Sequence, residues 1–174
     1  MGRRDPVNTH TLSILVSDRP GVLTRIAALF SRRGFNIESL AVGETEREGI
    51  SRMTVVANVD DEAALEQIVK QLNKLIEVRQ VLELESNAVR RQMILVKVKA
   101  DVTSRSQIID VVGLFRGKAV DVSNDSITIE ATGSTDKLEA LLNMLAPHGI
   151  QELAQSGHVA LGRGAKAMSI KSHK

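Results

Sequence analysis

The sequence predicts an α+β fold made of two tandem βαββαβ units. Runs in which apolar and polar residues alternate, or which are rich in β-branched residues, predict strands. Runs with apolar residues three or four positions apart predict helices. Along the 174 residues these runs follow the order strand, helix, strand, strand, helix, strand, and the order then repeats. The polar stretch 86–91 separates the two copies and is interpreted as a linker.

The first unit is expected over residues 1–85. Its helix ends are marked, because Gly34 suits the end of one helix and Asp60 with Asp61 suits the start of the next. The polar loop 43–49 is interpreted as a solvated hairpin tip. The predicted elements are strands at 11–17, 35–42, 50–59 and 78–84 and helices at 21–33 and 62–75.

The second unit is expected over residues 92–162. Ser104 followed by Gln107 has the form of a capping box, in which two side chains bond to the backbone at a helix start. Asn124 and Asp125 suit a two-residue hairpin turn. The predicted elements are strands at 93–98, 119–123, 126–132 and 150–155 and helices from 104 to about 115 and at 134–146.

Each unit would have the ferredoxin-like arrangement, a four-stranded antiparallel sheet with both helices on one face. The other face would then be bare, and a bare apolar face with open strand edges is unfavourable in a monomer. We therefore expect a homodimer through the first unit. The glycine-rich, basic residues 163–174 are expected to form a flexible tail.

The composition argues against several kinds of site. The chain has no Cys, which excludes disulfides, thiolate metal sites and a Cys nucleophile and fits a cytoplasmic location. Three Phe without Trp or Tyr, and a net charge of +2, argue against a nucleic-acid partner. No apolar run approaches the ~20 residues of a membrane span, and the four His lack metal-ligand spacing, so we expect no membrane and no metal.

The turn between the first strand and the first helix is the strongest candidate site. Asp18 suits a helix cap, and Pro20 suits the first helical turn. Gly21 lets a ligand approach the backbone closely. The first N–H groups of a helix lack internal partners and lie at the positive end of its dipole, so a small carboxylate would bind there. The alternative is an ordinary capped helix start with no ligand.

The residues around this turn resemble a known family. Segments 10–23 and 29–40 are similar to an ACT domain, and more narrowly to the small regulatory subunit of acetolactate synthase (acetohydroxyacid synthase). Segments 51–54, 70–75 and 114–117 also match that family, so the resemblance extends over nearly the whole chain. Segment 114–117 can equally be an ordinary helix end.

The resemblance implies a non-catalytic subunit. Such subunits bind the large catalytic subunit, raise its activity and confer feedback inhibition by valine or another branched-chain amino acid. Thiamine diphosphate, Mg²⁺ and FAD belong to the large subunit, so we expect no cofactor in this chain.

The resemblance also implies the residues of a valine site, whose two walls come from different protomers. Backbone N–H groups at 21–23 would bind the valine carboxylate, and Asp18 and Asn36 would accept from its ammonium group. Leu23 and Ile37 would contact its aliphatic side chain. The family often has Asn at the position of Asp18, and both can accept from an ammonium. The complete set is Asp18, Gly21, Val22 and Leu23 on one wall and Asn36 and Ile37 on the other.

The second unit has Asp101, Val102, Thr103 and Ser104 where the first has the Asp-x-Pro-Gly turn, so only the first unit is expected to bind valine. Two other functions stay open at this stage. An amino-acid-sensing transcriptional regulator would need a helix-turn-helix segment, and both halves are already assigned to sheet units. A small phosphatase of similar fold would need a nucleophile with its base or a Gly-x-x-x-x-Gly-Lys loop, and the sequence has neither.

Overall fold

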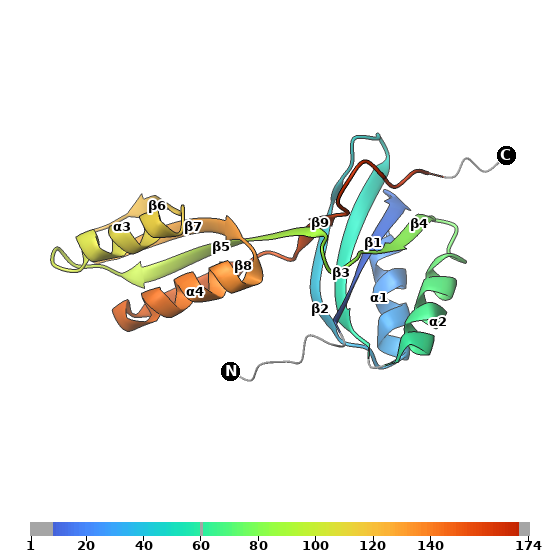
Figure 1. Ribbon diagram of the computed structural model, residues 1–174, viewed down its shortest axis with the longest axis horizontal. Coiled ribbons are helices and arrows are strands. Elements are labelled where there is room, and N and C mark those ends of the chain that lie inside the picture. Colours follow the sequence, from blue (N-terminus) through green and yellow to red (C-terminus); the bar gives the residue numbers. More distant parts are fainter. Residues whose placement is uncertain (1–8, 60, 171–174) are drawn as a thin grey trace. The chain divides into compact units, whose positions relative to one another are not determined.

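The computed structural model describes residues 9–59 and 61–170, and the chain forms two compact units (Figure 1). One unit holds the chain up to Val89 and again from His158 onward, and the other is Arg90–Gly157. The predicted boundaries were a linker at 86–91, a second domain to 162 and a free tail from 163. The observed division differs because the chain returns to the first unit after completing the second.

The first unit confirms the α+β fold class. Its strands form an antiparallel sheet in the order β2-β3-β1-β4, and both helices lie on one face of it (Figure 1). Leu12, Ile14 and Val16 alternate along β1 and are buried against Phe30 and the other core residues. The elements are β1 (Thr9–Ser17), α1 (Val22–Arg32), β2 (Ile37–Glu44), β3 (Ile50–Asn58), α2 (Glu62–Leu72), β4 (Val78–Glu83) and, near the C-terminus, β9 (Val159–Leu161).

The two helix starts of this unit differ from each other. At α2 the Asp61 side chain accepts a 3.0 Å hydrogen bond from the Ala63 N–H, as predicted for a cap; Asp60 lies outside the described residues. At α1 the capping residue is Gly21, with φ +87° and no side-chain cap. The prediction that Asp18 caps α1 is therefore wrong, because the chain makes a further turn through Pro20 before the helix begins.

The second unit repeats the same topology with its own core. Its antiparallel sheet has the order β6-β7-β5-β8, and Ile94, Val96 and Val98 of β5 are fully buried. The Asn124–Asp125 hairpin is confirmed by the 2.9 Å bond from the Ser123 N–H to the Ser126 carbonyl. The elements are β5 (Val89–Lys99), α3 (Arg105–Leu114), β6 (Lys118–Val122), β7 (Ser126–Gly133), α4 (Thr135–Leu145), the 3₁₀ helix η2 (Ala146–His148) and β8 (Ile150–Gln155).

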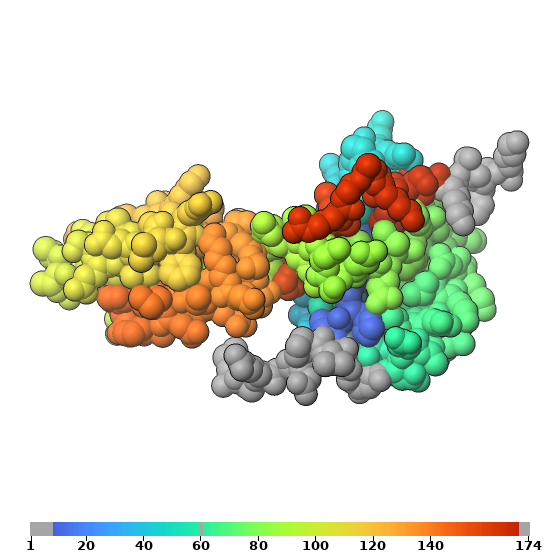
Figure 2. Space-filling view, in the orientation of Figure 1, coloured from blue at the N-terminus to red at the C-terminus, as the bar shows by residue number. Residues whose placement is uncertain are grey.

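The helix-free face of the first sheet mixes polar residues with buried Leu15 and Val56, and it carries the chain's own C-terminal segment. Because Leu12 and Ile14 face the helices, Ser13 faces the other side, where it is fully buried. On this face the His158 N–H donates to Ser39 Oγ at 2.8 Å, and Arg52 Nη1 lies 3.2 Å from Met168 Sδ. Figure 2 shows this segment, in red, lying over the first unit. The expectation that this face is bare is therefore wrong, because the C-terminal segment lies on it, and the face gives no argument for a dimer.

The predicted free tail is thus in contact with the first unit over its described part. Ala160 is buried in a small cluster with Leu84 and Ala88, and Arg163 Nε donates to the Asn87 carbonyl at 2.6 Å. Local sequence patterns do not reveal these contacts, since each joins residues far apart in the chain.

A chain that ends at Gly157 should therefore have a less stable first unit. The loss of Ala160 burial and of the hydrogen bond from Arg163 should cost about 1–3 kcal/mol, or several degrees in the midpoint of thermal unfolding. The measurement is circular dichroism on heating, and the control is a chain that ends at Ile170 and keeps the described contacts. An unchanged midpoint for the shorter chain would show that the segment contributes no stability.

Candidate functional site

The turn at 18–23 is held by backbone hydrogen bonds from two other parts of the first unit. The Asp18 N–H donates to the Gly49 carbonyl at 2.9 Å, which ties the turn to the tip of the β2–β3 hairpin. The Ser17 N–H donates to the Glu77 carbonyl at 2.7 Å, just before β4. Loop 43–49, predicted to be a solvated hairpin tip, thus also fixes the position of the turn.

The start of α1, at Gly21, is accessible to solvent. The Gly21 φ of +87° lies in the left-handed region, which residues other than glycine and asparagine rarely adopt. A Cβ built there would meet Arg25 Nη2 at an ordinary 3.9 Å, so the backbone angle, and not a lack of space, favours glycine. Asp18 and Gly21 are exposed, and Leu23 is 44% exposed. The Val22 N–H donates to the Arg19 carbonyl at a long 3.4 Å. The other N–H groups of the first turn, which have no intrahelical acceptor, can bind an anion from solvent.

Arg25 adds a positive charge beside this helix start. Its guanidinium forms an ion pair with Glu77, through Nη1 and Oε1, which joins α1 to the segment before β4. Neither Arg25 nor Gly49 was predicted to support the turn. Arg25 follows Gly21 by four positions on a predicted helix, and that spacing is the signal that could have found it.

The second predicted wall, Asn36 and Ile37, lies at the other end of the same sheet. Ile37 pairs with Ala57 on β3, whereas Ser17, which precedes the turn, pairs with Ile50 at the opposite end of β3. The 11 residues of α1 separate the two ends, a rise of roughly 16 Å. One chain therefore does not bring the six predicted residues together. Asn36 is exposed, and its carbonyl accepts from the Asn58 N–H at 3.3 Å.

The corresponding turn of the second unit is closed by its own side chains. Asp101 Oδ1 accepts from the N–H groups of Thr103 (2.9 Å) and Ser104 (2.8 Å) and from both of their hydroxyls. The hydroxyl of Thr103, and then the N–H and hydroxyl of Ser104, hold the pKa of Asp101 well below its ordinary value. The predicted capping box at Ser104 is wrong, because Ser104 Oγ donates to Asp101 and does not cap α3.

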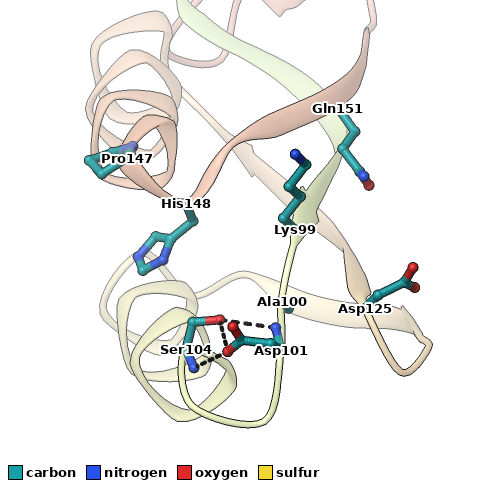
Figure 3. A pocket seen from close by; sticks show the side chains of 8 residues that line it. All are labelled: Lys99, Ala100, Asp101, Ser104, Asp125, Pro147, His148 and Gln151. Carbon is teal, nitrogen blue, oxygen red and sulfur yellow. Dashed lines mark hydrogen bonds between the residues drawn. The ribbon is translucent and has the colours of Figure 1, made fainter.

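A cavity of about 520 Å³ lies beside this second turn (Figure 3). Figure 3 shows Asp101 bonded to Ser104 at one end, away from Gln151. Because Asp101 already occupies the N–H groups of Thr103 and Ser104, these donors are not available to a bound carboxylate. The two turns thus differ in whether the protein's own side chains occupy the backbone N–H donors that a bound anion would need.

Replacing Asp101 with Asn should destabilise the second unit at neutral pH, because a charged acceptor of four hydrogen bonds becomes neutral. The folded-state pKa is depressed, so the contribution of the carboxylate is complete above about pH 4 and is lost as the pH falls below it. The difference in thermal midpoint between the two chains should therefore shrink between pH 5 and pH 2. Asp110→Asn on exposed α3 is the control. A difference that stays constant with pH would contradict this assignment.

Neither a metal cluster nor a spanning helix is found in the described part of the chain. Across residues 9–59 and 61–170, no three His, Cys, Asp or Glu side chains are grouped so that they could hold a metal ion. None of the helices in these ranges is long and apolar enough to cross a membrane.

Comparison with known proteins identifies two family regions. Residues 12–80 match the family described as AHAS small subunit-like ACT domain, and residues 91–164 match the family described as small subunit of acetolactate synthase. The acetolactate synthase small subunit of Mycolicibacterium smegmatis is 60% identical over 92% of this chain and 94% of its own length. A probable acetolactate synthase small subunit of Archaeoglobus fulgidus is 50% identical over 90% of this chain and 98% of its own length.

A solved structure has the same fold over nearly the full length. The crystal structure of an acetolactate synthase small subunit from Thermotoga maritima is 42% identical and superposes with a TM-score of 0.85. The match covers 92% of this chain and 100% of that one. Family and fold therefore agree over both units.

Proposed function

This chain belongs to the family of acetolactate synthase small subunits, and on this premise we propose that it is a regulatory subunit without catalytic residues of its own. It binds the large catalytic subunit, raises its activity and makes it sensitive to feedback inhibition by valine. The observation that supports the valine site is the exposed helix start at Gly21, where N–H groups without an intrahelical acceptor lie at the positive end of α1.

In the proposed site the N–H groups at 21–23 bind the valine carboxylate. Asp18 and Asn36 accept hydrogen bonds from the ammonium group, and Leu23 and Ile37 contact the isopropyl group. Because Asn36 and the Gly21 turn lie at opposite ends of one sheet, a complete site requires Asn36 and Ile37 from a second copy. This geometry, and not a bare sheet face, is now the argument for a homodimer through the first unit.

Inhibition follows if valine favours one arrangement of the two first units over another. A ligand shifts such an equilibrium only by its difference in affinity for the two states. The coupling between valine and the large subunit is expected to be about 1–3 kcal/mol, and it must be reciprocal for binding.

Reconstitution tests the proposed function. The large catalytic subunit is assayed for acetolactate formation alone, with the full chain, and with the full chain plus valine. We expect the chain to raise the rate and valine to lower it again, while the chain alone shows no turnover. A chain that forms no complex with the large subunit, or that turns over substrate by itself, would refute the proposal.

A further inference from the structure

Arg52 is a half-buried charge without a counter-ion. It lies on the helix-free face of the first sheet, where Nη1 donates to Ser13 Oγ at 2.7 Å and contacts Met168 Sδ at 3.2 Å. Over residues 9–59 and 61–170, no carboxylate forms an ion pair with it. A guanidinium held between a hydroxyl and a thioether has lost part of its hydration, so a bound anion would compensate its charge.

The free edge of this guanidinium has the geometry for a carboxylate. Both contacts of Arg52 use Nη1, which leaves Nε and Nη2 without a partner among the described residues. The Nε and Nη2 donors are parallel and bind the two oxygens of a carboxylate together. The bond to Ser13, a fully buried residue, fixes the guanidinium in place.

Arg52 lines a cavity of about 380 Å³ within the first unit. One side of the cavity is the β2–β3 hairpin, and the other is the returning strand β9. Ala160 and Leu161 supply apolar wall. Glu44, at the end of β2, and Glu46, in the exposed loop that follows, supply carboxylates, and Glu46 also forms a 3.6 Å ion pair with Arg47. The cavity therefore combines one fixed cation, apolar surface and two acidic groups.

We propose that this cavity is a second ligand site, which binds a small aliphatic amino acid as a zwitterion. The carboxylate binds Nε and Nη2 of Arg52, the aliphatic part lies against Ala160 and Leu161, and the ammonium group faces the acidic loop. The site lies within one chain, unlike the proposed valine site, and it needs the C-terminal segment for one of its walls. It adds to the proposed function but does not depend on it.

Calorimetric titration of the full chain with alanine, valine and leucine tests the second site. A Gly21→Asp chain, in which the proposed first site is blocked, should still bind at least one of these amino acids with one equivalent per chain. Adding Arg52→Met to it should remove this binding, and Arg52→Lys should weaken it at least about tenfold, because an ammonium lacks the paired donors. 2-Methylpropanoate, which has no ammonium group, should bind more weakly than valine.

A second measurement guards against a folding defect in the Arg52 variants. The Nε–H resonance of Arg52, assigned by its loss in Arg52→Lys, should shift when the amino acid is added to the Gly21→Asp chain. Absence of binding to that chain, or binding that survives Arg52→Met, would overturn the second site. If instead Gly21→Asp leaves all amino-acid binding unchanged, the proposed valine site is wrong. The Arg52 site is then tested separately by Arg52→Met and Arg52→Lys.

Discussion

Enzyme reconstituted with a Gly21→Asp chain should be activated as by the unchanged chain but should no longer be inhibited by valine. The new carboxylate would lie where we propose that the valine carboxylate binds, at the N–H groups of the first turn of α1, and two negative charges would repel. Losing hydrogen bonds to a charged ligand costs about 2 kcal/mol. The valine concentration for half-maximal inhibition should therefore rise at least about 30-fold.

Gly21→Asn is the matched control for this variant. Both substitutions place a side chain of the same size on a residue with φ +87°, and asparagine tolerates that angle better than most residues. Because it carries no charge, Gly21→Asn should keep much more of the inhibition than Gly21→Asp. Equal loss in both variants would assign the effect to the backbone and not to a carboxylate site, and undiminished inhibition in Gly21→Asp would show that the site lies elsewhere.

Removing the second unit should abolish activation of the large subunit but keep valine binding. Met93 and Leu95, on the helix-free face of the second sheet, are 42% and 37% exposed, and Leu114 at the end of α3 is 79% exposed. Exposed apolar groups of this kind mark surfaces that bind other proteins. We therefore expect the activating contacts to lie in this unit, and the rate with the shortened chain should fall to that of the large subunit alone.

The shortened chain must keep the C-terminal segment of the first unit. A short Gly/Ser linker would replace Arg90–Gly157, which is feasible because Ala88 and Ala160 share one buried cluster. The control is the chain that lacks everything after residue 85, which also loses β9 and the contacts of Arg52 with Met168. Calorimetry with valine and a thermal melt would show whether the first unit is intact. Full activation by the shortened chain would exclude the second unit from this role.

The helix ends show which structural features local sequence patterns can predict. Asp61 caps α2 as its position before an apolar run predicts. At the end of α3, in segment 114–117, Gly117 is not the left-handed residue, since Arg116 adopts φ +55° instead. Glycine suits position 117 because a Cβ there would lie in tight contact, 3.1 Å from the Glu130 carbonyl of β7, and only folding brings these two segments together.

The candidate site was likewise predicted only in part from local signals. The sequence pointed to an anion-binding helix start near Gly21, because glycine, proline and the strand-to-helix change are all local signals. It did not reveal that Asn36 lies at the far end of the sheet from that turn, or that Arg52 faces a cavity bounded by β9. These relations depend on strand register and on pairs of residues more than a hundred positions apart.

The sequence by itself determined the two βαββαβ units, their separate cores and the position of the exposed turn, because strand and helix periodicities and the choice of glycine are set by near neighbours. Only the tertiary structure decided that the chain returns to its first unit after Gly157 and lies on the helix-free face of that sheet. The contacts that fix this return, among them the pairing of β9 with β5, join residues far apart in the chain, so local sequence patterns do not predict them.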